Sequence, residues 1–160
     1  MAGVKSHELH TIGYEGLDTP DFLSLLSKHD IETLVDIREL PLSRKSGFSK
    51  KALAASVKRR GIGYVHLPQL GSPKAIRNRY RDDRNWTRYQ RDFLKYLAKQ
   101  DEAIADLAAM AGNSRCALLC FEADHNLCHR SMVADAVKQI SGIRVCHIHA
   151  TGLKIASPQI

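Results

Sequence analysis

Residues 116–140 of the chain read CALLCFEADHNLCHRSMVADAVKQI, and this stretch gives the clearest indication of the fold class. The apolar run 116–121 has the length of a buried strand, and the segment 131–140 repeats apolar residues at helical spacing. The turn between them therefore joins the carboxyl end of a strand to the amino end of a helix. Open α/β sheets bind their ligands at such turns.

The same alternation of apolar runs and amphipathic segments extends along the whole chain. The expected strands are 9–14, 33–38, 64–67, 116–121 and 144–148. A first helix is expected to begin after Asp18 or Thr19, and four more are expected over 49–60, 83–99, 101–110 and 131–140. A long basic loop is expected after residue 67. Buried strands that alternate with helices favour a parallel sheet covered on both faces. The sequence predicts a single three-layer, Rossmann-like α/β domain with a mainly parallel sheet of about five strands over residues 1–150. Residues 151–160 are expected to form a C-terminal tail.

The composition indicates one globular domain, with 160 residues of which 44% are hydrophobic and 26% charged. No apolar run approaches the roughly 18 residues of a membrane span, and the polar start lacks the apolar centre of a secretory signal. We therefore expect a cytoplasmic protein without a membrane partner. In that compartment cysteines stay reduced, so Cys116 and Cys146 are interpreted as small core residues, while Cys120 and Cys128 stay open.

The net charge of +7 is concentrated in two segments. Residues 43–60 contribute +7 and residues 74–91 contribute +5. Clustered positive charge favours an anionic partner, either a phosphorylated small molecule or nucleic acid. A solvated basic face without a specific partner is the alternative.

Four groups of residues follow one another in a specific order. They are Thr11-Ile12-Gly13-Tyr14-Glu15; Leu34-Val35-Asp36-Ile37-Arg38 with Pro41, Ser43, Arg44 and Phe48; Tyr64 with Leu70-Gly71; and Cys120 and Glu122 with Cys128-His129-Arg130. Through these motifs, from Thr11 to about Val137, the chain resembles the bacterial and archaeal family called domain of unknown function 488. The resemblance implies an α/β domain in which these residues share one site, and it implies no reaction. In many members the first motif ends in histidine-serine, where this chain has Tyr14-Glu15.

The segment 35–38 also resembles the rhodanese fold, in which a catalytic cysteine lies between a strand and a helix. In rhodaneses and cysteine phosphatases about five residues separate that cysteine from an arginine, so that backbone N–H groups ring an anion. Here Cys120 lies ten residues before Arg130, and Cys128 lies only two before it. The usual anion loop of those enzymes is therefore absent.

Cys128 is the leading candidate for chemistry. At the amino end of a helix, beside His129 and Arg130, its thiolate would be stabilised by the helix dipole and the neighbouring cations. An unreactive cap cysteine is the alternative. Arg130 can bind a phosphate or carboxylate with two N–H groups, or form a structural salt bridge with Asp36 or Glu122. The predicted catalytic residues are Cys128, Asp36 and Glu122, and the predicted substrate-binding residues are Glu15, Arg38, Ser43, Arg44, His129 and Arg130.

Cys120, His125, Cys128 and His129 are residue types that bind metals, but their spacing fits no common structural zinc pattern. His147 and His149 alternate on the last expected strand and are interpreted as edge-strand residues that face solvent. No metal and no other cofactor is predicted.

Two functions from different classes stay open. The first is an enzyme or ligand-binding site for an anionic small molecule at the carboxyl edge of the sheet, acting through Cys128 or a carboxylate on a nucleotide, nucleic-acid or phosphorylated substrate. The second is a nucleic-acid-binding module that contacts phosphates through basic residues, with the Cys128 region structural. The residues expected to bind nucleic acid are Lys74, Arg77, Arg79 and Arg81. Substrate and oligomeric state stay open.

Overall fold

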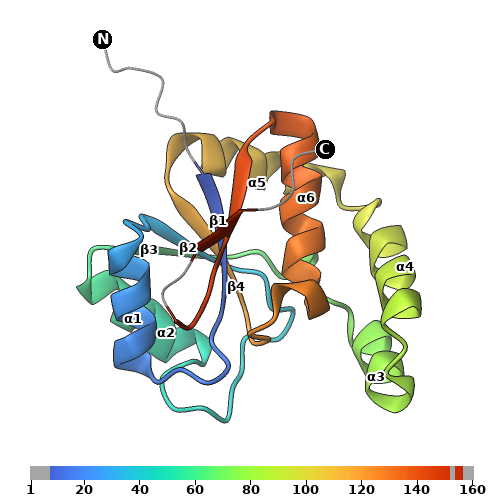
Figure 1. Cartoon of the computed structure of the whole chain (residues 1–160), viewed down its shortest axis with the longest axis horizontal. Helices are drawn as coiled ribbons and strands as arrows, with labels where there is room; N and C mark the ends of the chain where they lie inside the picture. The colour runs from blue at the N-terminus through green and yellow to red at the C-terminus, as the bar shows by residue number, and fades with distance from the viewer. Residues whose placement is uncertain (1–7, 152–153, 157–160) are drawn as a thin grey trace.

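The computed structural model describes residues 8–151 and 154–156, which fold around a six-stranded sheet (Figure 1). The strands are β1 (Glu8–Gly13), β2 (Thr33–Asp36), β3 (Gly63–His66), β4 (Cys116–Cys120), β5 (Arg144–Ile148) and β6 (Lys154–Ala156). The helices are α1 (Thr19–Lys28), α2 (Lys50–Arg59), α3 (Lys74–Asp83), α4 (Trp86–Leu97), α5 (Asp101–Asn113) and α6 (His129–Ser141), with short 3₁₀ turns η1 (Pro68–Leu70) and η2 (His125–Leu127). Within these residues no helix is long and apolar enough to cross a membrane.

The strand order is β3-β2-β4-β1-β5-β6, and β1 to β5 pair in parallel while β6 is antiparallel to β5. From β1 the chain passes through α1 and α2 toward β3 at one edge, and from β4 it passes through α6 toward the other edge. These connections cover opposite faces of the sheet (Figure 1). The adjacent strands β1 and β4 thus form a topological switch point, where sheets of this kind bind ligands. The predicted three-layer α/β domain with a mainly parallel sheet is confirmed.

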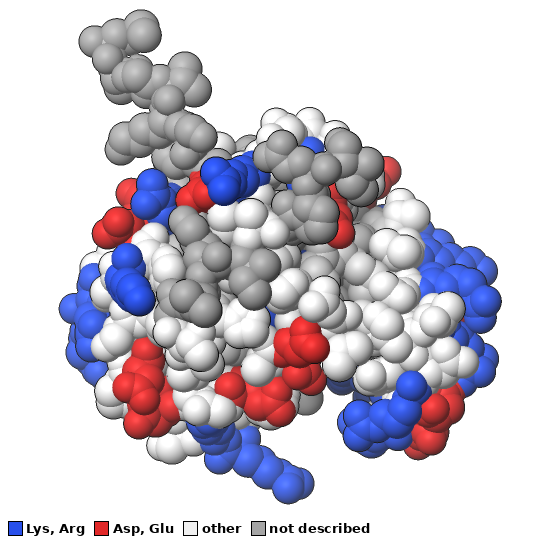
Figure 2. Space-filling view, in the orientation of Figure 1, with Lys and Arg blue, Asp and Glu red and all other residues white. Residues whose placement is uncertain are grey.

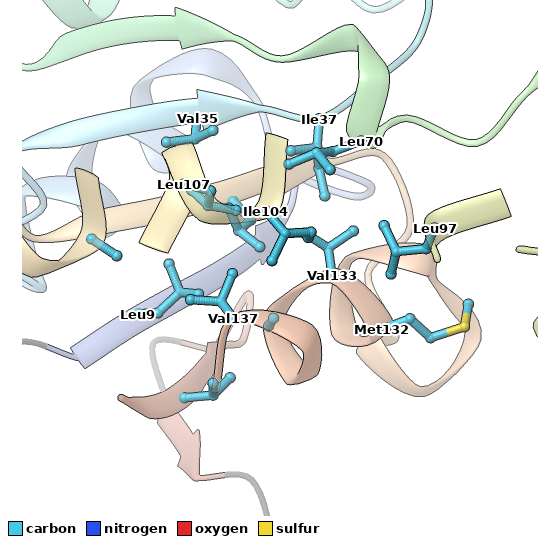
Figure 3. Close-up of a cluster of buried hydrophobic side chains, with 14 of the residues drawn as sticks. Leu9, Val35, Ile37, Leu70, Leu97, Ile104, Leu107, Met132, Val133 and Val137 are labelled. Carbon is cyan, nitrogen blue, oxygen red and sulfur yellow. The ribbon is translucent and has the colours of Figure 1, made fainter. Parts of the chain in front are cut away.

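Successive strand residues point to opposite faces, so the side chains of the sheet contribute to two separate apolar clusters, one on each face. On one face, Leu9 and Val35 pack against side chains of α5 and α6 such as Leu107 and Val137 (Figure 3). On the other face, the neighbouring strand residue Leu34 packs with the inner sides of α1 and α2. Burial on both faces explains why the strands read as continuous apolar runs.

Local side-chain and backbone chemistry explains where α1 begins and where α2 ends. The Asp18 side chain caps α1 by accepting a hydrogen bond of 2.9 Å from the backbone N–H of Asp21, and Pro20 lies in the first turn. Helix α2 ends at Arg59, and Gly61 follows with a φ of 75°. This left-handed conformation suits glycine at the end of a helix.

Two predictions about elements were wrong. The expected basic loop contains the helix α3, which covers Lys74–Asp83 and has no fully buried side chain, although Ile76 and Tyr80 pack partly buried against the core. Part of the expected tail forms β6, which pairs with β5, so the sheet continues beyond residue 150. The remainder of that tail lies outside the described residues.

Gly13, the last residue of β1, allows two segments to cross at the carboxyl edge of the sheet. A Cβ atom at this position would collide with the backbone carbonyl of Glu122, which passes directly over it. Only glycine leaves room for this close approach of two backbones. The turn after β4 is therefore pressed against the end of β1.

We expect Gly13→Ala to lower the free energy of unfolding by about 2 kcal/mol, because the added methyl group forces rigid backbone segments apart. Chemical denaturation followed by circular dichroism measures the change. The matched control is Gly112→Ala in α5, where a Cβ meets nothing within 4 Å. This control should be neutral or stabilising by up to about 1 kcal/mol, since alanine favours a helix. Equal stabilities for the two variants would contradict the crossing described above.

Candidate functional site

A cavity of about 350 Å³ opens at the carboxyl edge of the sheet, where β1 and β4 end. Its wall contains large apolar or aromatic side chains, namely Tyr14, Leu40, Leu42, Tyr89, Phe121 and Leu127. Its polar residues are Arg38, Glu39, Ser72, Arg77, Glu122 and His129, and both Cys120 and Cys128 reach it. A volume of this size with few converging polar groups is typical of a small-molecule site.

The Asp36 and Arg38 side chains form a closed pair after β2. Arg38 donates from Nε and Nη2 to the Asp36 carboxylate at 2.9 and 2.7 Å, and Nη1 donates to the Phe48 carbonyl at 2.7 Å. Tyr64 donates its hydroxyl hydrogen to the same carboxylate. Burial favours a lower pKa for Arg38, but its hydrogen bonds and the charge of Asp36 prevail, and the pKa is raised. Arg38 therefore lines the cavity as a fixed cation, while Asp36 is fully buried behind it.

The structure joins Cys128 to Cys120 by a disulfide. When this bond is reduced, Cys128 and His129 form a thiol–imidazole pair at the start of α6. His129 Nε2 lies 2.9 Å from the carbonyl oxygen of Ile37, which can only accept, so Nε2 carries the hydrogen. Nδ1 is then a free acceptor, and it lies 3.7 Å from Cys128 Sγ. Burial lowers the pKa of His129 to about 4, and the positive charges of Arg130 and Arg77 act in the same direction. The hydrogen bond to the Ile37 carbonyl raises this pKa but does not offset the burial. The imidazole is thus neutral at pH 7 and oriented toward the thiol.

Arg130 lies beneath the cavity and is fully buried. Its guanidinium donates to Thr11 Oγ1 at 3.1 Å, to Cys120 Sγ at 3.0 Å and to two backbone carbonyls, those of Glu122 and Ala123. Burial lowers its pKa to about 10, with the negative charges of Glu122 and Asp124 opposing the shift, so it stays a cation at neutral pH. The salt bridge considered between Arg130 and Asp36 is absent from the described residues, because Asp36 pairs with Arg38. Arg130 holds the turn after β4 and does not line the cavity.

Glu15 and Glu122 place two carboxyl groups beside each other at the same edge. Glu15 accepts a hydrogen bond of 3.0 Å from the backbone N–H of Ala123, and Glu122 lines the cavity. Burial raises the pKa of Glu122, and the adjacent Glu15 raises it further. The hydrogen bond from the backbone N–H of Asp124 lowers this pKa but does not reverse the shift. The Glu15 and Glu122 pair can share a proton, and a carboxyl group that holds its proton can act as a general acid.

His147 is buried and does not face solvent as predicted, because β6 covers the edge of β5. Its ring stacks on that of His125, with centroids 3.9 Å apart, and its Nδ1 lies 2.7 Å from Thr11 Oγ1. Burial, followed by the influence of His125 and Arg130, lowers the pKa of His147 to about 3. Across residues 8–151 and 154–156, no three histidine, cysteine or acidic side chains are arranged to hold a metal.

The structure gathers most of the predicted site residues and separates a few. Cys128, Glu122, Arg38 and His129 line the cavity, Glu15, Asp36 and Arg130 contact its lining residues, and Ser43 and Arg44 are not part of it. Ser43 instead closes its own loop through hydrogen bonds with Ser49 and Lys45. Among the residues assigned to nucleic acid, Lys74, Arg79 and Arg81 are exposed on α3, whereas Arg77 reaches the cavity.

Sequence reasoning missed much of the apolar wall. Leu40 and Leu42 lie in the loop after β2 with exposures of 60% and 66%, and Phe121 is 49% exposed. Apolar side chains left open beside a cavity point to a ligand surface. Leu42 and Phe121 adjoin predicted site residues in the sequence, which was the only available signal.

The comparisons with known proteins identify the family of this chain and no function. A family model described as domain of unknown function DUF488 matches residues 18–137. The chain belongs to this DUF488 family. Neither the curated proteins nor the solved structures contain a match. The DUF488 match includes the whole segment from β2 to most of α6, and with it every cavity residue except Tyr14.

Replacing Arg130 by methionine should lower the free energy of unfolding by about 3 kcal/mol, because the buried Thr11 hydroxyl and two partly buried carbonyls lose their donor. Arg144→Met is the control, since Arg144 is 59% exposed and pairs with Glu8 at 3.4 Å. That control should cost less than about 1 kcal/mol. Urea denaturation measures both changes. A cost for Arg130→Met no greater than that of the control would show that the guanidinium does not hold the turn.

Proposed function

We propose that this DUF488 domain is a cysteine-dependent enzyme that binds a small anionic molecule in the cavity at the carboxyl edge of the sheet. The observation that carries the proposal is the contact between Cys128 Sγ and the unprotonated Nδ1 of His129 at the cavity wall. A nucleophile, an acceptor for its proton and a carbonyl that orients the acceptor make up the usual arrangement of an activated thiol. The N-terminal end of α6 adds a favourable dipole for the thiolate.

Arg77 is the residue best placed to bind an anionic group. Its Nη1 donates to Glu39 at 2.7 Å and to the Ser72 carbonyl, and its side chain is 33% exposed. Arg38 and Arg130 are occupied by buried partners, so their N–H groups are not available. An incoming carboxylate or phosphate can replace Glu39 on Arg77, and the apolar wall then holds the body of the ligand.

Alkylation rates test both parts of the proposal in the reduced protein. At pH 7 Cys128 should react with iodoacetamide at least about tenfold faster than Cys116, because burial raises the pKa of Cys116. Peptide mass spectrometry assigns the modified residue. Equal rates for the two cysteines would exclude an activated Cys128.

Replacing the neutral reagent by iodoacetate probes the anion site. Arg77→Gln should reduce the ratio of the iodoacetate rate to the iodoacetamide rate up to about fivefold, as expected for a partly exposed charge interaction of about 1 kcal/mol. The control Arg79→Gln removes the same charge from α3 at a residue that is 55% exposed and pairs with Asp92. A ratio that falls equally in both variants would indicate general attraction and no anion site at Arg77.

A second candidate function, nucleic-acid binding, is favoured by the hairpin of α3 and α4. Helix α3 has no fully buried side chain, and Lys and Arg side chains gather along the outer side of this hairpin (Figure 2). Exposed basic residues on the hairpin are Lys74, Arg79, Arg81, Arg84, Arg91 and Lys95. Trp86 and Tyr89 pack with Tyr80 inside the hairpin, so they are poorly placed for stacking on bases.

Fluorescence anisotropy with a labelled oligonucleotide tests this candidate. At about 50 mM salt we expect weak binding that falls steeply as salt rises, with a logarithmic slope near 0.9 for each duplex phosphate contact. Glutamine at Lys74, Arg79 and Arg81 should weaken binding at least about tenfold and flatten the slope. Glutamine at Lys51, Lys58 and Arg59 of α2 removes the same charge and should have a smaller effect. Equal losses in both triple variants would contradict a binding surface on the hairpin.

A further inference from the structure

The cavity contains two cysteines whose sulfur atoms touch. Cys120 is the last residue of β4 and Cys128 the N-cap of α6, and a disulfide joins their Sγ atoms in the structure. Their Cα atoms are 7.7 Å apart. Relaxed disulfides usually span about 4.4–6.8 Å between Cα atoms, so this backbone also accommodates the two separate thiols.

The two sulfurs lie in different surroundings. Cys128 Sγ faces His129, whereas Cys120 Sγ accepts a hydrogen bond of 3.0 Å from the guanidinium of Arg130. A cation at that distance stabilises a thiolate on Cys120. In thiol–disulfide exchange a stabilised thiolate leaves faster, while the attacking sulfur needs access to its target. Cys128 therefore has a proton acceptor, His129, beside its sulfur, and Cys120 has a cation, Arg130, beside its own.

Both cysteines line the cavity, although each is at least 95% buried from bulk solvent. A small molecule in the cavity can reach them, while large reagents cannot. The other two cysteines, Cys116 and Cys146, are buried and do not line this cavity. A purely structural disulfide would not need access from a cavity built for a ligand.

We propose that Cys120 and Cys128 act as a redox pair that exchanges with a small disulfide bound in the cavity, preferentially one that carries a carboxylate. This inference rests on the proposed reactivity of Cys128 and adds a second sulfur and a reaction class. The Cys128 thiolate attacks one sulfur of the small disulfide, whose S–S bond breaks and whose other half leaves as a thiolate and takes up a proton. The thiolate of Cys120 then attacks Cys128 Sγ and releases the second half. The pair loses two electrons, the small disulfide gains them, and a dithiol reductant restores the pair by the reverse steps.

Intact-mass spectrometry of the reduced protein with cystine, a disulfide that carries two carboxylates, tests the sequence of steps. The wild-type protein should lose two hydrogens without retaining an adduct, and it should release two equivalents of cysteine. Cys120→Ser should stop at a mixed disulfide on Cys128, and Cys128→Ser should form neither product. Cys116→Ser, which removes a buried cysteine outside the cavity, should behave as the wild type.

Each failure has its own outcome. A wild-type protein that stops at the mixed disulfide, with Cys128 still alkylated rapidly, would refute the redox pair and leave the proposed nucleophile intact. Slow alkylation of Cys128 together with no adduct in Cys120→Ser would refute both. Cys120→Ala, with circular dichroism on every variant, separates a chemical effect from loss of the fold. A Cys120–Cys128 disulfide that an excess of small dithiol reduces only when the protein unfolds would show a structural bond and overturn the proposal.

Discussion

The burial of one guanidinium group, that of Arg130, governs the architecture around the site. A cation without solvent exposure is costly unless its N–H groups find acceptors. Arg130 finds them in the Thr11 hydroxyl, the Cys120 sulfur and the carbonyls of Glu122 and Ala123. These bonds fold the turn after β4 back over the end of β1, where the missing side chain of Gly13 leaves room. Helix α6 consequently begins at the sheet edge, and its first side chains reach the cavity.

A buried ion pair, between Asp36 and Arg38, supports the cavity wall that Arg38 lines. Asp36 and Arg38 neutralise each other behind the cavity, and Arg38 also holds the Phe48 carbonyl. Because both buried arginines are occupied, the reactive groups of the cavity are its sulfurs, its neutral imidazole and its paired carboxyl groups. The anion preference that we propose would then depend on Arg77, which lines the cavity and is 33% exposed. The arginines that the sequence motif presents most clearly serve as supports for the site.

The fold could be predicted because its strands are buried on both faces and its helices carry clear apolar stripes. Helix α3 could not, since residues 74–83 offer only Ile76 and Tyr80 as apolar side chains at helical spacing, and Tyr80 is held by aromatic contacts with α4. Strand β6 has three residues, and its pairing depends on β5 being in place. The convergence of distant motifs followed from parallel topology alone. The parallel topology did not predict which arginine pairs with which acceptor, because that choice depends on how the turns after β2 and β4 pack against each other.

The two candidate functions share one helix and are therefore physically linked. Arg77 points from α3 to the cavity rim, while Lys74, Arg79 and Arg81 are on the exposed surface of that same helix. A polyanion that binds the exposed residues also makes the electrostatic potential near Arg77 more negative, and it therefore weakens the binding of a small anion to Arg77. Conversely, a ligand that replaces Glu39 on Arg77 leaves that carboxylate free beside the hairpin, where it repels phosphates. Since binding linkage is reciprocal, we expect each of the two proposed anionic partners to weaken the binding of the other, and less so where the small ligand carries little charge.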